Sequence, residues 1–147
     1  MNAETDARGG ILGTVVCLPA RDLDATLAFY TEVFGLPGLV IEEGMITVEL
    51  PGLSLFLLEH EQFERYSAKA GRRARYPDAG VGVILSCAIE SREALDAMLE
   101  TAPAHGGSVP REAAPDDWTG LYLGYVFDPD GHHWELAVSG SAGGEQR

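Results

Sequence analysis

Cysteine, basic residues and long apolar runs are all scarce in this 147-residue chain. The two cysteines, Cys17 and Cys87, have no metal-binding spacing and make no disulfide framework, so we expect a reduced, cytoplasmic protein. No apolar run approaches the ~20 residues of a membrane helix, and the N-terminal residues show no signal-peptide pattern. Ten Lys and Arg against 23 Asp and Glu give a net charge of −13, which argues against nucleic-acid binding.

The few basic residues are unevenly distributed. Residues 60–80 hold five of them against three acidic residues, so this connector carries about +2 and the remainder about −15. A solvated loop whose arginines pair with the acidic body is the simpler interpretation, and an anion site or dimer contact is the alternative. The acidity of the body favours solubility or a cationic ligand.

The hydrophobic pattern predicts an α+β fold with an internal repeat. Asp22 and Ser91 are typical N-cap residues of two helices, 69 residues apart, and the turn glycines Gly52 and Gly131 are 79 apart. Strands are predicted at 11–19, 38–43, 44–50, 53–59, 81–89, around 107–110, 120–127 and 132–138. The pattern therefore predicts two βαβββ modules (11–59 and 81–138), the connector 60–80, and disordered tails at 1–10 and 139–147.

Strand alternation predicts which side chains share the concave face of the sheets. We expect this face to carry Val15, Cys17, Ser54, Phe56, Ile84, Ser86, His133 and Glu135. Side chains of the opposite parity are expected to pack against the helices; they are Leu12, Val16, Leu18, Leu55, Leu57, Leu85, Cys87, Trp134, Leu136 and Val138. The two cysteines then point to opposite faces, which argues against a disulfide between them.

Two segments carry a family resemblance. Residues 18–30 (LPARDLDATLAFY), followed by Phe34-Gly35-Leu36, resemble the opening of the vicinal oxygen chelate superfamily, and residues 127–136 (FDPDGHHWEL) resemble its closing hairpin. That superfamily includes glyoxalase I, extradiol dioxygenases, and fosfomycin and bleomycin resistance proteins. The resemblance covers residues 11–138 and implies a glyoxalase-like fold, two βαβββ modules forming a curved, mixed sheet lined by a cleft, in a homodimer.

The resemblance also implies where a divalent metal would bind. The superfamily's ligands come from the first and last strands of each module, and here those positions hold Val15, Phe56, Ile84 and Glu135. A catalytic metal needs about three protein donors, which one carboxylate does not provide. We therefore expect no metal or other cofactor, with a divalent metal as the alternative. The Asp-Pro-Asp-Gly stretch is interpreted as a turn, with His132 as a turn or surface residue.

Glu135 is the candidate functional residue of this face. It is a candidate general base or anchor for a ligand cation, and the alternative is an ancestral remnant satisfied by water, His133 or an arginine. The other candidate ligand-binding residues are Phe56, Trp118, Tyr122, Tyr125 and His133. Trp118 lies in an acidic loop, which is typical of a ligand rim and equally of a loop pinned to its own core.

These features favour a protein resembling the metal-free bleomycin resistance proteins. Such a protein binds a small, cationic or aromatic molecule, and antibiotic sequestration is one such role. Two alternatives stay open. One is a metal-dependent lyase, isomerase or dioxygenase of the superfamily. The other is a metal-free acid/base isomerase that uses Glu135 or His133.

Overall fold

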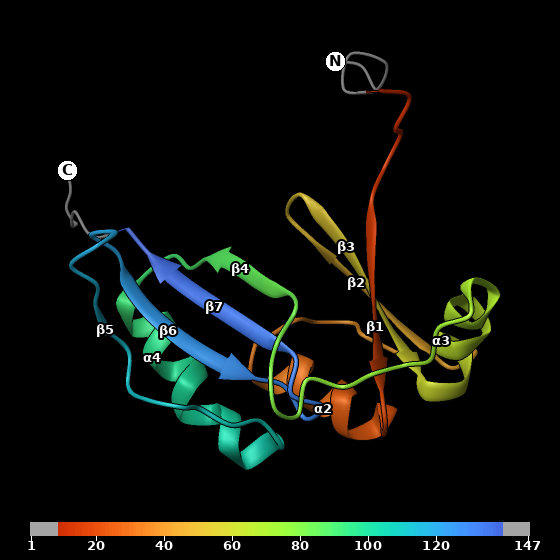
Figure 1. Cartoon of the computed structure of the whole chain (residues 1–147). Helices are drawn as coiled ribbons and strands as arrows, with labels where there is room; N and C mark the ends of the chain where they lie inside the picture. Colours follow the sequence, from red (N-terminus) through yellow and green to blue (C-terminus); the bar gives the residue numbers. More distant parts are fainter. Residues whose placement is uncertain (1–8, 140–147) are drawn as a thin grey trace. The chain divides into compact units, whose positions relative to one another are not determined.

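The computed structural model describes residues 9–139, and the predicted tails lie largely outside them. The chain divides into two compact units, which are described separately. The first contains residues 9–23 and 39–74, and the second contains residues 24–38 and 75–139. Figure 1 shows a sheet in each unit. No helix among the described residues is long and apolar enough to span a membrane.

The first unit is built on a three-stranded sheet. Strands β1 (Val15–Ala20), β2 (Met45–Leu50) and β3 (Leu53–Glu59) lie in the order β1-β3-β2. β1 runs parallel to β3, and β2 pairs with β3 in an antiparallel hairpin. Gly52 closes the hairpin with a φ of 80°, a conformation that glycine adopts readily. Helix α3 (His60–Ser67) and the short helix η1 (Ala68–Ala70) follow β3.

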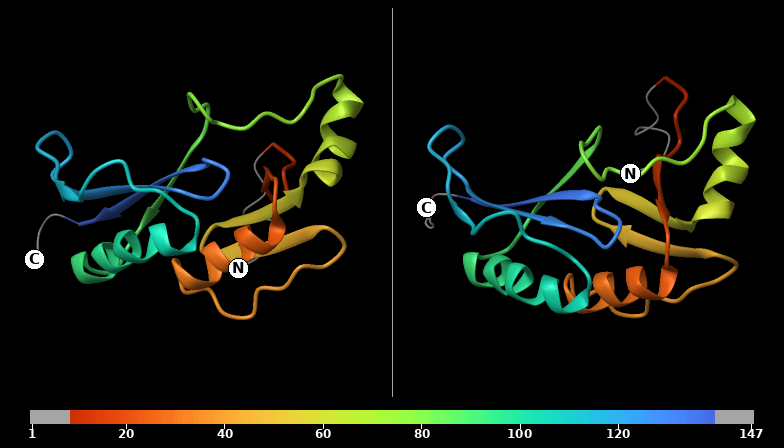
Figure 2. Two further views of the ribbon diagram at one scale, coloured as in Figure 1. Left: turned by 90° about the horizontal axis from the view of Figure 1, so that it is seen from below. Right: turned by 60° about the horizontal axis from the view of Figure 1, so that its bottom comes forward.

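The second unit is built on a four-stranded sheet. Its strands are β4 (Ile84–Ala88), β5 (Ala114–Pro115), β6 (Tyr122–Phe127) and β7 (His133–Val138), in the order β4-β7-β6-β5. β4 is parallel to β7, and β6 is antiparallel to β7. Helix α4 (Arg92–Thr101) packs on one face of this sheet, as Figure 2 shows, and leads into η2 (Ala102–His105).

Helix α4 forms for local reasons that the sequence shows. The hydroxyl of Ser91 accepts a hydrogen bond from the backbone N–H of Ala94, which confirms the predicted N-cap. Leu95 and Leu99 are buried on the face that the helix presents to the sheet. A Cβ at Gly124 of β6 would lie 2.7 Å from Leu95 and 3.0 Å from Leu99, so the missing side chain permits this close helix–strand packing.

Helix α2 (Leu23–Glu32) packs with the second sheet, whereas the sequence repeat assigns it to the first module. The Trp134 ring on β7 lies 6.1 Å from the Tyr30 ring and 5.0 Å from the Phe34 ring, both in edge-on geometry. Such aromatic contacts between residues about 100 positions apart cannot be read from local periodicity. The sequence repeat does not indicate this packing partner of the helix.

Several predicted strands are shorter than expected or absent. The prediction of a strand at 38–43 is wrong, because only an isolated bridge pairs Glu42 with Met45. Glu43 and Gly44 have φ values of 54° and 76°, which an extended strand cannot accommodate. The predicted strand near 107–110 is reduced to a single bridge between Ser108 and Phe127. β1 begins at Val15, and Leu12 is 89% exposed, so the expected packing of Leu12 against the helices is wrong.

Candidate functional site

The expected alternation holds on the second sheet. Leu85, Trp134 and Leu136 are buried toward the helices, while Ser86 is exposed and Glu135 is partly exposed on the other face. The strand register then fixes neighbours on that open face. Ser86 of β4 and Tyr125 of β6 flank Glu135, while Ile84 and Phe127 flank His133. We call this group of six side chains the β7 face.

Glu135 lies at the centre of a hydrogen-bonded cluster on the β7 face. The Ser86 hydroxyl donates to its Oε1 at 2.8 Å, and the Tyr125 hydroxyl donates to its Oε2 at 3.0 Å. Burial raises the pKa of Tyr125 above its ordinary value of 10.0, and the hydrogen bond to Glu135 raises it further. Two neutral hydroxyl donors orient the carboxylate without neutralising it, and each oxygen retains a lone pair for a further donor.

Arginine also approaches this cluster. The guanidinium carbon of Arg111 lies 5.7 Å from the centre of the Tyr125 ring, within the range of a cation–π contact. Its positive charge opposes the rise in the Tyr125 pKa. The Tyr125 ring, next to Glu135, therefore already contacts one flat cation, the Arg111 guanidinium.

His133 lies between two aromatic rings on the same face. Its ring centre is 5.6 Å from that of Tyr125 and 5.1 Å from that of Phe127, both in edge-on geometry. The Nε2 atom is buried and has no hydrogen-bond partner within residues 9–139. Leaving a buried polar atom unsatisfied costs about 1–3 kcal/mol. Such an atom beside an oriented carboxylate is a candidate for contact with a ligand.

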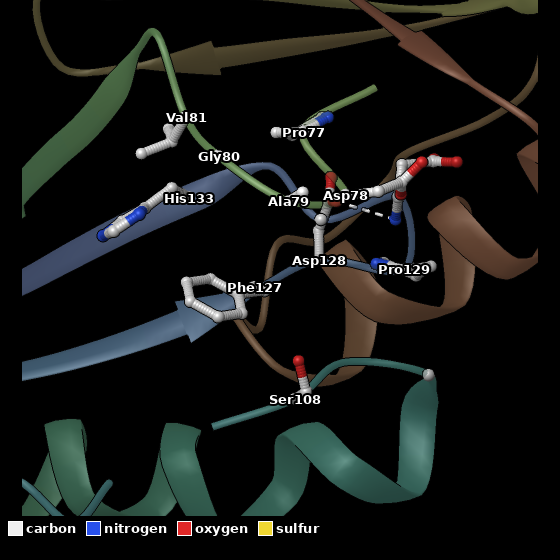
Figure 3. Close-up of a pocket in the computed structure, with 13 residues that line it drawn as sticks. Pro77, Asp78, Ala79, Gly80, Val81, Ser108, Phe127, Asp128, Pro129 and His133 are labelled. Atoms are coloured by element: carbon white, nitrogen blue, oxygen red, sulfur yellow. Dashed lines mark hydrogen bonds between the residues drawn. The ribbon is translucent and has the colours of Figure 1, made fainter. Parts of the chain in front are cut away.

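A pocket of about 560 Å³ adjoins His133 and Phe127 (Figure 3). The segment Pro77–Val81 forms one wall, and the β6–β7 turn and Ser108 form the others. The backbone oxygen of Pro77 would lie 3.0 Å from a Cβ at Gly131, so segment and turn approach closely. The volume falls in the range of small-molecule sites.

The positions of the superfamily's metal ligands do not fit a metal in this chain. Val15 and Phe56 lie on the sheet of the first unit, and Ile84 and Glu135 lie on the sheet of the second. Three of these four side chains are hydrocarbons that offer no donor atom, which leaves the carboxylate of Glu135 as the one donor among these positions. A divalent ion at these positions would have one protein ligand instead of about three.

A second group of potential donors lies in the β6–β7 turn. Ligand atoms of Asp128, Asp130 and His132 lie within 4.8 Å of one another, and all three residues are buried. Asp128 has a structural function, because its Oδ1 accepts the backbone N–H groups of Asp130 and His132 at 2.9 Å. Its Oδ2 accepts the hydroxyl of Tyr30. Gly131 has a φ of 91°, as the turn prediction requires.

The sequence predicts a turn or surface residue at His132. It lies in the turn between β6 and β7, and only the surface alternative is wrong. It is 7% exposed, and its ring lies 6.4 Å from that of Tyr76, a residue of the connector. Because this contact joins residues 56 positions apart, the local turn sequence does not reveal it.

Tyr122 and Trp118, two predicted ligand-binding residues, are not among the six side chains of the β7 face. Tyr122 is on the helix side of β6, where its hydroxyl donates to Asp96 at 2.7 Å and the Arg92 guanidinium lies 4.5 Å from its ring centre. Trp118 is 93% exposed in the loop before β6. The structure therefore brings Tyr125, His133 and Glu135 together, and it does not bring Tyr122 to them.

Three residues of the β7 face, Ile84, Ser86 and Phe127, were not predicted as ligand contacts. Phe127 shares the parity of Tyr125, and Ser86 shares that of Ile84, so alternation alone could have identified both. The pocket could not be identified this way, because Pro77–Val81 has no periodic pattern that predicts its position.

An α+β fold with a carboxylate on an open sheet face matches the glyoxalase-like class. The Glyoxalase/Bleomycin resistance protein/Dioxygenase superfamily model matches residues 12–136, and the chain belongs to this family. The resemblance to the vicinal oxygen chelate superfamily is thereby confirmed.

Two named plant proteins are similar in sequence. The chain is 34% identical over 126 residues to a putative lactoylglutathione lyase of Brassica oleracea var. gemmifera, and 33% identical to lactoylglutathione lyase GLX1 of Arabidopsis thaliana. Each alignment covers 81% of this chain and 41% of the relative. The chain thus spans about two-fifths of the length of these curated relatives.

Solved structures share the fold. A glyoxalase-related enzyme from Fulvimarina pelagi is 26% identical, with a TM-score of 0.71 and 86% of each chain covered. The hypothetical protein SA1046 from S. aureus has a TM-score of 0.75 at 22% identity, covering 93% of this chain and 99% of its own.

Proposed function

We propose that this chain is a metal-independent, small-molecule-binding protein of the glyoxalase-like family, with its ligand on the β7 face. The observation that carries the proposal is the environment of the Glu135 carboxylate. It is the only donor among the four positions of the superfamily's metal ligands, and Ser86 and Tyr125 orient its carboxylate through hydroxyl groups. A carboxylate so held accepts hydrogen bonds from a ligand without needing a metal.

The chemistry of this face favours a flat cation as the ligand. Glu135 supplies the negative charge, and Tyr125, His133 and Phe127 supply aromatic surface. The net charge of −13 increases the local concentration of cations around the protein. Binding would lower the concentration of a free cationic compound without chemistry, and antibiotic sequestration is one role of this kind.

Ligand-induced stabilisation tests the proposal. Bleomycin and flat cationic aromatic compounds are titrated in a thermal-shift assay, each compared with an anionic compound of similar size. Glu135→Gln removes the charge, and Glu49→Gln is the matched control because that strand glutamate also accepts a serine hydroxyl, from Ser54 at 2.5 Å. We expect the cations to stabilise the native protein and Glu49→Gln, but not Glu135→Gln. No shift with any cation at large excess would contradict the proposal.

A metal-dependent lyase is the second candidate, because the two plant relatives are named lactoylglutathione lyases. Dialysis against Ni²⁺, Zn²⁺, Mn²⁺ or Fe²⁺, followed by elemental analysis and a lactoylglutathione lyase assay, separates the two functions. Under our proposal the protein retains less than stoichiometric metal, and Glu135→Gln leaves that amount unchanged. Stoichiometric metal that disappears in Glu135→Gln would favour the lyase.

A further inference from the structure

We propose that His133 and the adjoining pocket form the second half of the ligand site, and that the ligand is an aromatic amine with a hydroxyl group at its far end. This inference rests on the proposed function and specifies its ligand. The ammonium group would bind Glu135, the ring would lie along Phe127, and the hydroxyl would bind His133 Nε2.

The spacing of the two polar groups comes from the strand. His133 and Glu135 are two residues apart on β7, so they point to the same face about 6.6 Å apart along the strand. Phe127 and Tyr125 lie opposite them on β6. A ligand that reaches both polar groups must therefore be elongated and must pass over aromatic side chains.

The two polar groups differ in what they can accept. Glu135 is negatively charged and bonded to two hydroxyls, whereas His133 Nε2 is buried without a partner in the described part of the chain. A hydroxyl both donates and accepts, so it can bind Nε2 in either tautomer of the neutral ring. An ammonium group complements the carboxylate best. The order of groups along the ligand follows from these properties.

The pocket provides the space for the far end of the ligand. His133 and Phe127 belong to its lining as well as to the β7 face, so the two regions are continuous. Figure 3 shows Val81 beside His133 and Ser108 on the other side of Phe127. The Asp128 carboxylate in the same lining already accepts hydrogen bonds from two backbone N–H groups and from Tyr30. His133, another residue of this lining, has a buried Nε2 atom that the described chain leaves without a hydrogen-bond partner.

Three probe compounds distinguish the contact of the ammonium group with Glu135 from the contact of the hydroxyl group with His133. Tyramine carries both the ammonium and the hydroxyl group, phenethylamine lacks the hydroxyl, and 4-ethylphenol lacks the amine. Dissociation constants are measured by NMR titration of the backbone amides. We expect tyramine to bind about fivefold more tightly than phenethylamine, the ratio that one net neutral hydrogen bond gives. We expect a larger advantage over 4-ethylphenol, because the bond to Glu135 is charge-assisted.

Variants of the protein show which residue produces each difference in affinity between the probes. In His133→Phe, which retains an aromatic ring between Tyr125 and Phe127, the advantage of the hydroxyl should disappear while that of the ammonium persists. In Glu135→Gln the advantage of the ammonium group should disappear while that of the hydroxyl persists. His133→Gln keeps a hydrogen-bonding group and should restore part of the hydroxyl advantage. His60→Phe, on helix α3 of the first unit, is the control and should change neither.

The outcomes distinguish this inference from the proposed function. A hydroxyl advantage that survives in folded His133→Phe overturns the role of His133 and leaves the proposed function intact. An ammonium advantage that survives in Glu135→Gln overturns the proposed function as well. Binding of larger cations that depends on Glu135, with no effect of tyramine on the amides of β6 and β7, overturns the ligand class alone. If His133→Phe does not fold, His133→Gln decides, because loss of the hydroxyl advantage there would contradict the inference.

Discussion

Replacing Tyr30 with Phe should destabilise the protein more than any other removal of a single hydroxyl described above. The Tyr30 hydroxyl donates to Asp128 Oδ2 at 2.8 Å and accepts a hydrogen bond from Trp134 Nε1 at 3.0 Å. Tyr30 is 0% exposed, Asp128 3% and Trp134 2%, so water does not replace the lost partner easily. The phenyl ring would keep its edge-on contacts with the neighbouring aromatic rings.

The magnitude follows from the two groups left behind. Each buried polar group without a partner costs about 1–3 kcal/mol, and Asp128 retains its two backbone hydrogen bonds through the other oxygen. We therefore expect Tyr30→Phe to lower the free energy of unfolding by about 3 kcal/mol. For a chain of this length that corresponds to a fall in Tm of roughly 6–12 °C.

Urea denaturation followed by circular dichroism measures this loss, with an unchanged m-value as the sign that only stability has changed. Tyr66→Phe is the control, because Tyr66 is 62% exposed and should change stability by less than about 0.5 kcal/mol. A loss below about 1 kcal/mol in Tyr30→Phe would show that the three-residue hydrogen-bond network does not hold the β6–β7 turn to the helix.

The same hydroxyl predicts a dependence on alkaline pH. Burial raises the pKa of Tyr30 well above its ordinary value of 10.0, and the Asp128 carboxylate raises it further. Because the folded-state pKa is raised, this stabilisation is fully present below pH 10 and is lost as the pH rises toward the folded value. Stability measured from pH 8 upward should therefore fall less steeply above pH 10 in Tyr30→Phe than in the native protein. Equal slopes would contradict this assignment.

Other substitutions test the packing, the helix cap and the loop before β6. Gly107→Ala places a Cβ 2.9 Å from a backbone oxygen of β6, so it should cost about 1–3 kcal/mol in urea denaturation, whereas Gly82→Ala meets nothing within 4 Å and should not destabilise. Ser91→Ala removes the N-cap of α4 and should cost about 1 kcal/mol by the same assay. The Thr119 side chain and backbone lower the pKa of Asp116 below its ordinary 3.8, so Thr119→Ala should raise that pKa toward 3.8 in an NMR titration.

Local sequence signals predicted the secondary structure where one residue determines the geometry. The cap at Ser91 and the turn at Gly131 are both confirmed, because each depends on a side chain or a φ value within a few residues. The prediction of a strand at 38–43 is wrong for a reason that is also local, the backbone conformation of a few residues. Left-handed backbone at Gly38, Glu43 and Gly44 interrupts an apolar stretch that otherwise has a strand-like composition.

Contacts between distant residues set the limit of the sequence prediction. Alternation placed Glu135 and His133 on one open face, and the register then gave their neighbours. Tyr122 was grouped with Tyr125 although three residues along a strand point to opposite faces, so this error contradicts the parity rule itself. The burial of His132 and the pocket beside His133 depend on the connector, whose position no periodic signal encodes.

Side-chain alternation along β7 separates the residues that stabilise the fold from the residues of the proposed binding face. Trp134 and Leu136 face the helices and are buried, while His133 and Glu135 face outward. Truncating Trp134 to Ala should cost about 3–5 kcal/mol, the range for a buried aromatic side chain. Glu135→Gln keeps the shape of its side chain. Its amide oxygen still accepts a hydrogen bond from one of the two hydroxyls, and its NH₂ group donates to the oxygen of the other. It should therefore change the unfolding free energy far less while removing the charge that the proposed ligand needs. If both substitutions unfolded the protein equally, the outward residues would belong to the core and the proposed binding face would not exist.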